Sequence, residues 1–287
     1  MTSSTILVTG ATGNVGAPVA RLLLEKGVPV RLAVRNMEKA RARFGEGANL
    51  EIVPLDFEKA ETYEAAFRGV SGMFLMRPPA VADASKLNAA VDAARSAGVQ
   101  KVAFLSLQGV ERNPLLPHAK TEKYLKSTGL TYTFLRASFF MQNLDTTHRQ
   151  DIAEYGEIFV PAGRGRTSFI DVRDIAAVAV KALTEEGHEG RAYELTGADA
   201  LDYFQVADIF TDVLGKRVTY PNPTPWRFWR RMRKRGVPAP FVGVMIGLYT
   251  VCRFGLASHV SPETARLLGR EPISLRQYVE DYRESWA

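Results

Sequence analysis

Three glycines near the N-terminus have the spacing of a phosphate-binding loop. The segment Gly10-Ala11-Thr12-Gly13-Asn14-Val15-Gly16 directly follows an apolar run at residues 5–9. Small residues at this spacing let backbone N–H groups approach a diphosphate, and the helix that follows adds partial positive charge at its N-terminus. The residues that we predict to bind the diphosphate of a dinucleotide are Gly10, Ala11, Thr12, Gly13, Asn14 and Val15. The alternative is a tight glycine turn without a ligand.

Arg35 lies at the position where dinucleotide-binding proteins distinguish NAD from NADP. Sites that prefer NAD place an acid about 20 residues after the glycine loop, where it binds the ribose 2′-hydroxyl. This chain has Arg35 there, and its nearest acid is Glu38. A guanidinium can bind a 2′-phosphate through two hydrogen bonds, so we predict NADP(H) as the cofactor, with added charge from Arg31 and Lys39. The alternative is a solvated arginine at a strand end.

Further candidates follow the next predicted strands. Ligands of open α/β sheets bind at the carboxyl ends of the strands. Asp56 and Phe57 follow the third strand, where a carboxylate can accept from an adenine amino group and a ring can cover it, although Asp56 can equally cap the next helix. The other predicted cofactor contacts are Met76, Arg77 and Ser106.

His118 and Glu122 are the candidates for proton transfer. Their spacing places both on one face of a predicted helix at residues 117–127, so Glu122 can orient the imidazole. A histidine can act as a general acid near neutral pH. The alternative is that His118 merely begins the helix after Pro117 and that Glu122 is a surface acid.

Several other chemistries lack their residues. None of the ten tyrosines has a lysine four positions later, so the Tyr-x-x-x-Lys pair of ordinary short-chain dehydrogenases is missing. The sequence also has no Gly-x-Ser-x-Gly elbow, no His-Glu-x-x-His and no Walker loop. The four histidines are scattered, so we expect no metal site.

Hydride transfer from a nicotinamide needs a flat, apolar slot that excludes water. Aromatic and sulfur side chains that could form its walls are Phe139, Phe140, Met141, Trp226, Phe228 and Trp229. Ordinary packing is the alternative for each of them.

The elements that must position these residues alternate regularly in the first half of the chain. Strands are predicted at residues 5–9, 30–34, 50–55, 72–76, 102–106 and 132–135, and helices at 15–25, 37–44, 61–67, 84–97 and 117–127. Such alternation predicts a doubly wound parallel sheet of the Rossmann type with helices on both faces, an α/β fold.

The alternation loosens after residue 136. Helices are predicted at 139–155, 171–183 and 203–214, and short strands at 158–160, 168–170, 191–195 and 217–220. A linker rich in proline covers 221–225, and the rest looks helical to 275–286. We predict a cofactor domain at 1–136, with later additions to its sheet from 157–196, and a smaller, mostly helical substrate portion at 137–287.

Composition narrows the class of protein. With 287 residues, 46% of them hydrophobic and 24% charged, the chain resembles an ordinary globular protein. Its single cysteine rules out an internal disulfide. Residues 1–5 have no basic flank, and the apolar run 237–252 is too short to span a bilayer, so we expect a cytoplasmic protein without a membrane span.

The net charge of +6 has a local origin. Six basic residues lie within 227–235 without an acid, and the rest of the chain has 31 charges of each sign. We therefore expect no general nucleic-acid surface. The basic segment could bind an anionic surface, a phosphate or a partner, or form a helix with a solvated basic face.

The motifs together resemble the NmrA-like family of atypical short-chain dehydrogenases/reductases. The resemblance rests on the glycine loop and Arg35, and on the segments 118–122 (HAKTE), 132–136 (YTFLR), 140–143 (FMQN), 169–176 (FIDVRDIA) and 268–272 (LGREP). It spans nearly the whole chain. It implies NADP(H) binding by a Rossmann domain with a small C-terminal substrate domain, and a place beside the nicotinamide for His118.

The family resemblance leaves two functions open, because the family contains quinone reductases and isoflavone-reductase-type enzymes as well as regulators that sense the cofactor. We expect an NADPH-dependent oxidoreductase that transfers hydride to a small flat carbonyl or quinone-type substrate. The alternative is a non-catalytic NADP(H) sensor that docks a protein partner. The sequence does not indicate an oligomeric state.

Overall fold

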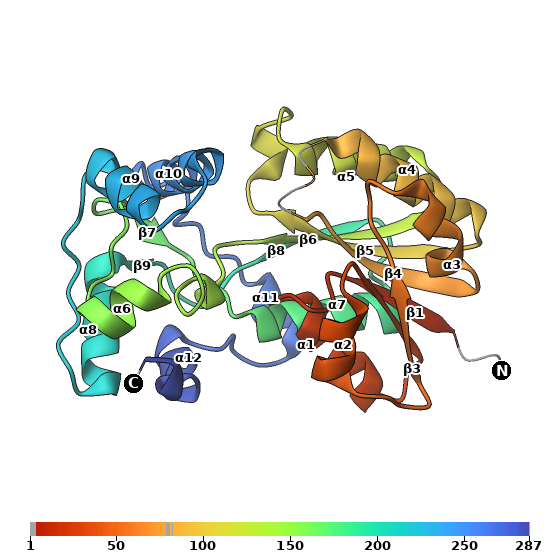
Figure 1. Ribbon diagram of the computed structural model, residues 1–287, viewed down its shortest axis with the longest axis horizontal. Helices are drawn as coiled ribbons and strands as arrows, with labels where there is room; N and C mark the ends of the chain where they lie inside the picture. Colours follow the sequence, from red (N-terminus) through yellow and green to blue (C-terminus); the bar gives the residue numbers. More distant parts are fainter. Residues whose placement is uncertain (1–3, 79–80, 82, 287) are drawn as a thin grey trace. The chain divides into compact units, whose positions relative to one another are not determined.

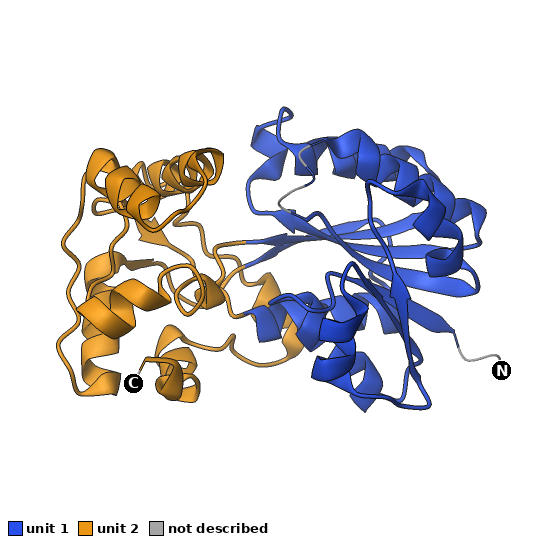
Figure 2. Ribbon diagram, in the orientation of Figure 1, with its two compact units in different colours: residues 1–137, 172–195 blue, residues 138–171, 196–287 orange. Residues whose placement is uncertain are grey.

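The computed structural model describes residues 4–78, 81 and 83–286, and it divides into two compact units (Figures 1 and 2). Unit 1 contains residues 1–137 and 172–195, and unit 2 contains 138–171 and 196–287. Residues 1–3 of the N-terminal segment considered above lie outside the described part.

Unit 1 is built on a seven-stranded parallel sheet of order β3-β2-β1-β4-β5-β6-β8. Its strands are β1 (Thr5–Thr9), β2 (Val30–Val34), β3 (Leu50–Pro54), β4 (Val70–Met76), β5 (Lys101–Leu107), β6 (Thr131–Ala137) and β8 (Arg191–Leu195). The central strands are buried on both faces, as their continuous apolar runs require. This is the predicted doubly wound Rossmann arrangement, in which the strand order reverses between β1 and β4.

Helices cover both faces of this sheet. They are α1 (Gly16–Glu25), α2 (Met37–Phe44), α3 (Tyr63–Phe67), α4 (Ala84–Ser96), α5 (Pro117–Ser127) and α7 (Val172–Thr184), with the 3-10 turns η1 (Ala60–Thr62) and η2 (Val110–Arg112). Figure 1 shows α3, α4 and α5 on one face and α1, α2 and α7 on the other. Local signals start several of them: Asn36 caps α2 by accepting from the amide of Lys39, and Pro117 stands in the first turn of α5.

Unit 2 is mostly helical. Its helices are α6 (Arg149–Tyr155), α8 (Tyr203–Leu214), α9 (Pro225–Lys234), α10 (Ala239–Arg253), α11 (Glu263–Leu268) and α12 (Leu275–Asp281), with the 3-10 turns η3 (Met141–Asn143) and η4 (Arg283–Trp286). A small antiparallel pair joins β7 (Arg166–Thr167) to β9 (Leu201–Asp202). The unit has its own apolar core, in which Trp286, Tyr203 and Tyr278 are the largest fully buried side chains.

The predictions for residues 139–170 and 217–220 need correction. The helix expected over 139–155 exists only as α6, because the backbone around Phe139 and Met141 bonds to Ile170 instead. The expected strands at 158–160, 168–170 and 217–220 are reduced to isolated bridges and to β7, which pairs with β9 rather than with the main sheet. Apolar alternation cannot distinguish a strand from an irregular buried segment whose partners come from elsewhere in the chain.

No helix in the described part of the chain combines the length and apolar character needed to cross a membrane. The apolar run that the sequence places at 237–252 forms most of α10, which has 15 residues.

Candidate functional site

In unit 1, one side chain adds to the backbone pairing of β1 with β4, the two strands at which the strand order reverses. The hydroxyl of Thr9, the last residue of β1, donates to the carbonyl oxygen of Phe74 (3.1 Å) and accepts from the amide of Met76 (2.9 Å), both in β4. These bonds fix the carboxyl ends of β1 and β4 against each other. In sheets of this topology the ligand binds outside these two strand ends.

The glycine loop begins directly after Thr9. Gly10 has φ +61°, a backbone conformation that favours glycine, and its carbonyl oxygen accepts from the amide of Gly13 at 2.8 Å. A Cβ on Gly16 would lie 2.6 Å from the carbonyl carbon of Gly10 and 2.8 Å from the carbonyl oxygen of Thr9. Glycine is therefore required at Gly16 for α1 to begin this close to the strand end.

The loop presents unsatisfied donors. Among the described residues, the amides of Thr12, Asn14 and Val15 donate no hydrogen bond to another backbone or side-chain group of the protein. They lie at the N-terminus of α1, where the aligned peptide dipoles favour an anion. These donors and the missing Cβ atoms fit a diphosphate group.

Arg35 is exposed directly after β2, and no ion pair forms with it among the described residues. Lys39 is also exposed and lies in the first turn of α2. The sequence predicts that Arg31 adds positive charge for the 2′-phosphate, but its guanidinium is already bound within the protein. Its guanidinium binds Glu51 at 2.6 Å and the backbone oxygen of Ala66 at 3.0 Å, so it stabilises the sheet edge.

Arg43 is a residue of this site that sequence reasoning missed. Its guanidinium donates to the carbonyl oxygen of Thr12 at 2.9 Å and so fixes the glycine loop. Burial and the neighbouring charge of Arg21 lower the pKa of Arg43. The only signal in the sequence is the basic character of the helix after Arg35, which does not say which basic residue reaches the loop.

Asp56 and Phe57 follow β3 as predicted. One carboxylate oxygen of Asp56 accepts from the amide of Glu58 (3.0 Å) and forms a local turn. Asp56 does not cap the next helical turn, because η1 has Lys59 at its N-cap without a side-chain cap. Phe57 exposes only 6% of its surface and packs in the core, and its carbonyl accepts from the hydroxyl of Tyr63. Their contact with an adenine stays a prediction.

Arg77 follows β4 and is largely withdrawn from solvent. One of its terminal nitrogens donates to the carbonyl oxygen of Val81, and its Nε is buried without a partner. Burial lowers the pKa of Arg77. A buried N–H without a partner costs free energy. The contact of Arg77 with the cofactor stays a prediction.

His118 lies in the first turn of α5, half-buried, with its ring 6.1 Å from that of Phe104. Burial, with the positive charge of Arg77, lowers the pKa of His118 from 6.5 to about 4. The imidazole is therefore neutral at pH 7. A neutral ring can donate one hydrogen bond and accept another. The predicted role of His118 as a general acid stays a prediction.

Glu122 does not orient His118, which corrects the sequence-based pairing. Both of its oxygens accept from Arg136, at 3.1 and 2.8 Å, and one also accepts from the buried hydroxyl of Ser106 at 2.6 Å. Glu122 is buried, and Arg136 is further paired with Glu111 at 3.2 Å. This cluster joins α5 to β5 and β6 and uses Ser106 as a structural partner.

Comparison with known proteins agrees with this geometry. The sequence matches the NmrA-like family over residues 2–262. The chain belongs to the NmrA-like family. It is 34% identical to an NAD(P)H azoreductase of Xenophilus azovorans, over 96% of each chain.

Two solved structures resemble this NmrA-like protein over nearly their full length. An NADPH-dependent quinone oxidoreductase of Escherichia coli, solved with NADPH, superposes with a TM-score of 0.85 at 29% identity, covering 96% of this chain and 99% of the other. A triphenylmethane reductase of Citrobacter sp., solved with NADP(H), gives a TM-score of 0.84 at 29% identity, covering 97% and 99%. The resemblance inferred from the motifs is thereby confirmed.

The predicted substrate residues all belong to unit 2 of this NmrA-like protein and have unequal exposure. Met141 and Phe228 are buried core residues, 2% and 0% exposed, so packing accounts for them. Phe139 packs edge-on against Phe169, and part of its surface stays exposed. The remaining candidates are Phe140 and Trp229, which are half-buried, and Trp226, which is 69% exposed.

Proposed function

We propose that this NmrA-like protein is an NADPH-dependent reductase of small, flat carbonyl or quinone-type acceptors. The observation that carries the proposal is the glycine loop at the β1–β4 reversal, whose free amides at Thr12, Asn14 and Val15 fit a diphosphate. Membership in a family that includes NAD(P)H-dependent reductases supports the assignment.

Arg35 supports NADPH over NADH. It is exposed after β2 at the position where an acid would bind a ribose 2′-hydroxyl, and the described residues leave its guanidinium free of an acidic partner. A guanidinium forms charge-assisted hydrogen bonds to a 2′-phosphate. Lys39, in the next helix, adds positive charge.

The reaction needs few protein side chains. When bound, the cofactor supplies the hydride, and solvent supplies the proton that completes reduction of a carbonyl or quinone. The chain has no Tyr-x-x-x-Lys pair for proton delivery. We assign to the neutral ring of His118 a hydrogen bond donated to the acceptor oxygen as negative charge develops there, a role that an imidazole with a lowered pKa performs without becoming charged.

The relatives and the exposed aromatic side chains of unit 2 support this acceptor class. The relatives are named as an azoreductase, a quinone oxidoreductase and a reductase of triphenylmethane dyes. Phe139 and Phe140 keep exposed surface that can contact such a flat molecule.

Turnover is tested by following NADPH oxidation spectrophotometrically with a panel of quinones, an azo dye and simple aldehydes. We expect quinones or the azo dye to be reduced, and His118→Gln to lower kcat while NADPH affinity stays unchanged. Micromolar NADPH affinity with no acceptor reduced would instead support the non-catalytic sensor. Full activity of His118→Gln would remove His118 from the mechanism.

Cofactor choice is tested by calorimetric titration with NADPH and NADH. We expect Arg35→Gln to reduce the preference for NADPH by roughly 10- to 100-fold, the value of a lost charge-assisted pair, while NADH affinity stays unchanged. Arg95→Gln, at an exposed position of α4, is the matched control. An unchanged ratio in Arg35→Gln would refute the assignment.

A further inference from the structure

One long segment of unit 2 is wholly without acids. Residues 213–262 contain nine Lys or Arg and no Asp or Glu, leaving 28 Lys and Arg against 31 Asp and Glu elsewhere. The positive net charge of the protein therefore resides in this segment. It includes α9 and α10, which are neighbours in unit 2.

Two basic residues, Arg231 of α9 and Arg235 directly after the helix, are neutralised within the unit. Asp151, fully buried, binds Arg231 at 2.8 Å and Arg235 at 2.7 Å. Glu157 also binds Arg231, whose guanidinium lies 3.3 Å from the centroid of the Phe159 ring. These contacts attach α9 to the core of the unit and leave no acid for the other cations of the helix.

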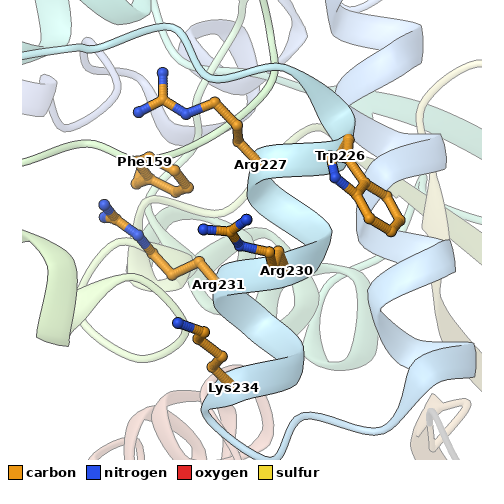
Figure 3. Close-up of a pocket in the computed structure, with 6 residues that line it drawn as sticks. All are labelled: Phe159, Trp226, Arg227, Arg230, Arg231 and Lys234. Carbon is orange, nitrogen blue, oxygen red and sulfur yellow. The ribbon is translucent and has the colours of Figure 1, made fainter.

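Four cations of α9 form no ion pair among the described residues. One of them, Arg233, donates to the carbonyl oxygen of Val237 at 2.7 Å. The other three are the exposed side chains of Arg227, Arg230 and Lys234. Figure 3 shows them on the same side of α9 as Arg231. Arg227 stands in the first turn, where the helix dipole disfavours a cation, so helix stability does not account for it.

These cations line an open hollow of about 460 Å³. Its lining residues are Phe159, Trp226, Arg227, Arg230, Arg231 and Lys234. Figure 3 shows Trp226 pointing away from the basic side chains, and 69% of its surface is exposed. The hollow is therefore suited to anionic groups, with an exposed indole at its border.

The neighbouring helix exposes an apolar face. Phe241, Val244, Leu248 and Val251 have 43–59% of their surface exposed, and α10 has no charged residue before Arg253. Of the ten large hydrophobic side chains that are exposed in the described part of the chain, seven lie between positions 226 and 256. A concentrated apolar surface of this kind marks an interaction site.

The basic and apolar faces point outward from one core. Phe228 of α9 lies 5.8 Å, ring to ring, from Tyr249 of α10, and both belong to the apolar core of unit 2. Met232 and Met245 are buried in the same core. Because both helices pack their buried faces on it, their opposite faces, one basic and one apolar, are presented to the surroundings.

We propose that the outward surface of α9 and α10 binds an anionic phospholipid bilayer, with the cations of α9 on the headgroups and the apolar face of α10 in the interface. A basic helix beside exposed Trp, Phe and Leu is the composition of interfacial membrane helices. A soluble phosphate would leave the apolar face without a partner. A second copy would bring two basic helices to one interface, and like charges there are unfavourable.

The test is co-sedimentation of the full chain with vesicles of phosphatidylcholine alone and of phosphatidylcholine mixed with phosphatidylglycerol. We expect binding to the mixed vesicles that weakens as salt is added. Each cation near an anionic surface contributes about five-fold to binding, so the variant R227Q/R230Q/K234Q should bind on the order of 100-fold more weakly. The control K86Q/K123Q/K126Q removes the same charge from exposed positions of α4 and α5 and should bind like the wild type.

A second variant, V244S/L248S, tests the apolar face. Both side chains are exposed, so the fold should persist, which thermal melting checks, and binding to mixed vesicles should fall at least about ten-fold. Equal binding by the basic variant and its control would overturn the proposal. Binding of inorganic pyrophosphate without binding of vesicles would also overturn it. A third contrary result would be a protein that binds no vesicles and sediments as a dimer, which V244S/L248S converts to a monomer.

Discussion

The ring of His118 should remain neutral over most of the accessible pH range, and this can be measured directly. Burial, with the charge of Arg77, lowers its pKa from 6.5 to about 4. The folded protein thus favours the neutral imidazole, whereas the unfolded chain protonates it near pH 6.5. The stabilisation is complete above pH 6.5 and is lost as the pH falls from 6.5 toward 4.

The magnitude follows from the two pKa values. At pH 5 the unfolded imidazole is almost fully protonated and the folded one is not, so His118 lowers the free energy of unfolding by about 2 kcal/mol relative to pH 7. At pH 4 the loss reaches about 3 kcal/mol. The variant His118→Gln lacks this imidazole. On acidification to pH 5 or pH 4, its free energy of unfolding should therefore fall less than that of the wild type, by these amounts.

Two measurements test this. The chain has four histidines, so NMR titration of their imidazole protons is tractable, and His118→Gln identifies the signal that disappears. Urea unfolding of both proteins at pH 7 and pH 5 then gives the difference in pH dependence. A His118 signal that titrates near pH 6.5, or identical pH dependence of stability in the two proteins, would refute the reasoning and restore the protonated general acid.

Three further substitutions probe the glycine loop and the buried ion pairs. Gly16→Ala would place a methyl group 2.6 Å from the carbonyl carbon of Gly10. We expect NADPH affinity, measured by calorimetry, to fall at least about ten-fold and the free energy of unfolding in urea to fall by about 2 kcal/mol. Wild-type values would mean that the close approach of the two backbone segments is unimportant. Glu122→Gln weakens the pair with Arg136 and should lower the free energy of unfolding in urea by about 2 kcal/mol. An unchanged value would mean that this cluster does not contribute to stability. Asp151→Asn leaves two arginines underneutralised and should lower the unfolding free energy by about 3 kcal/mol, an expectation contradicted if the urea midpoint stays unchanged.

The local features of this protein were determined by its sequence. The spacing of Gly10, Gly13 and Gly16 predicted the loop, because glycine is needed wherever backbone must approach backbone closely. Alternating apolar runs predicted the six leading strands and their helices, and Pro117 marked the start of one helix. These signals act over a few residues, so the sequence alone specifies them.

Tertiary structure alone decided the partners of the charged groups. Glu122 was expected to reach His118 one turn away, but it binds Arg136 and Ser106, which the parallel sheet brings beside α5. Likewise Arg31, expected to add charge for a 2′-phosphate, pairs with Glu51, and Arg43 reaches the glycine loop. Helical spacing shows which side chains share a face, but not which one finds a stronger partner on another element. That choice depends on burial and on contacts between distant residues, which also set the neutral state of His118.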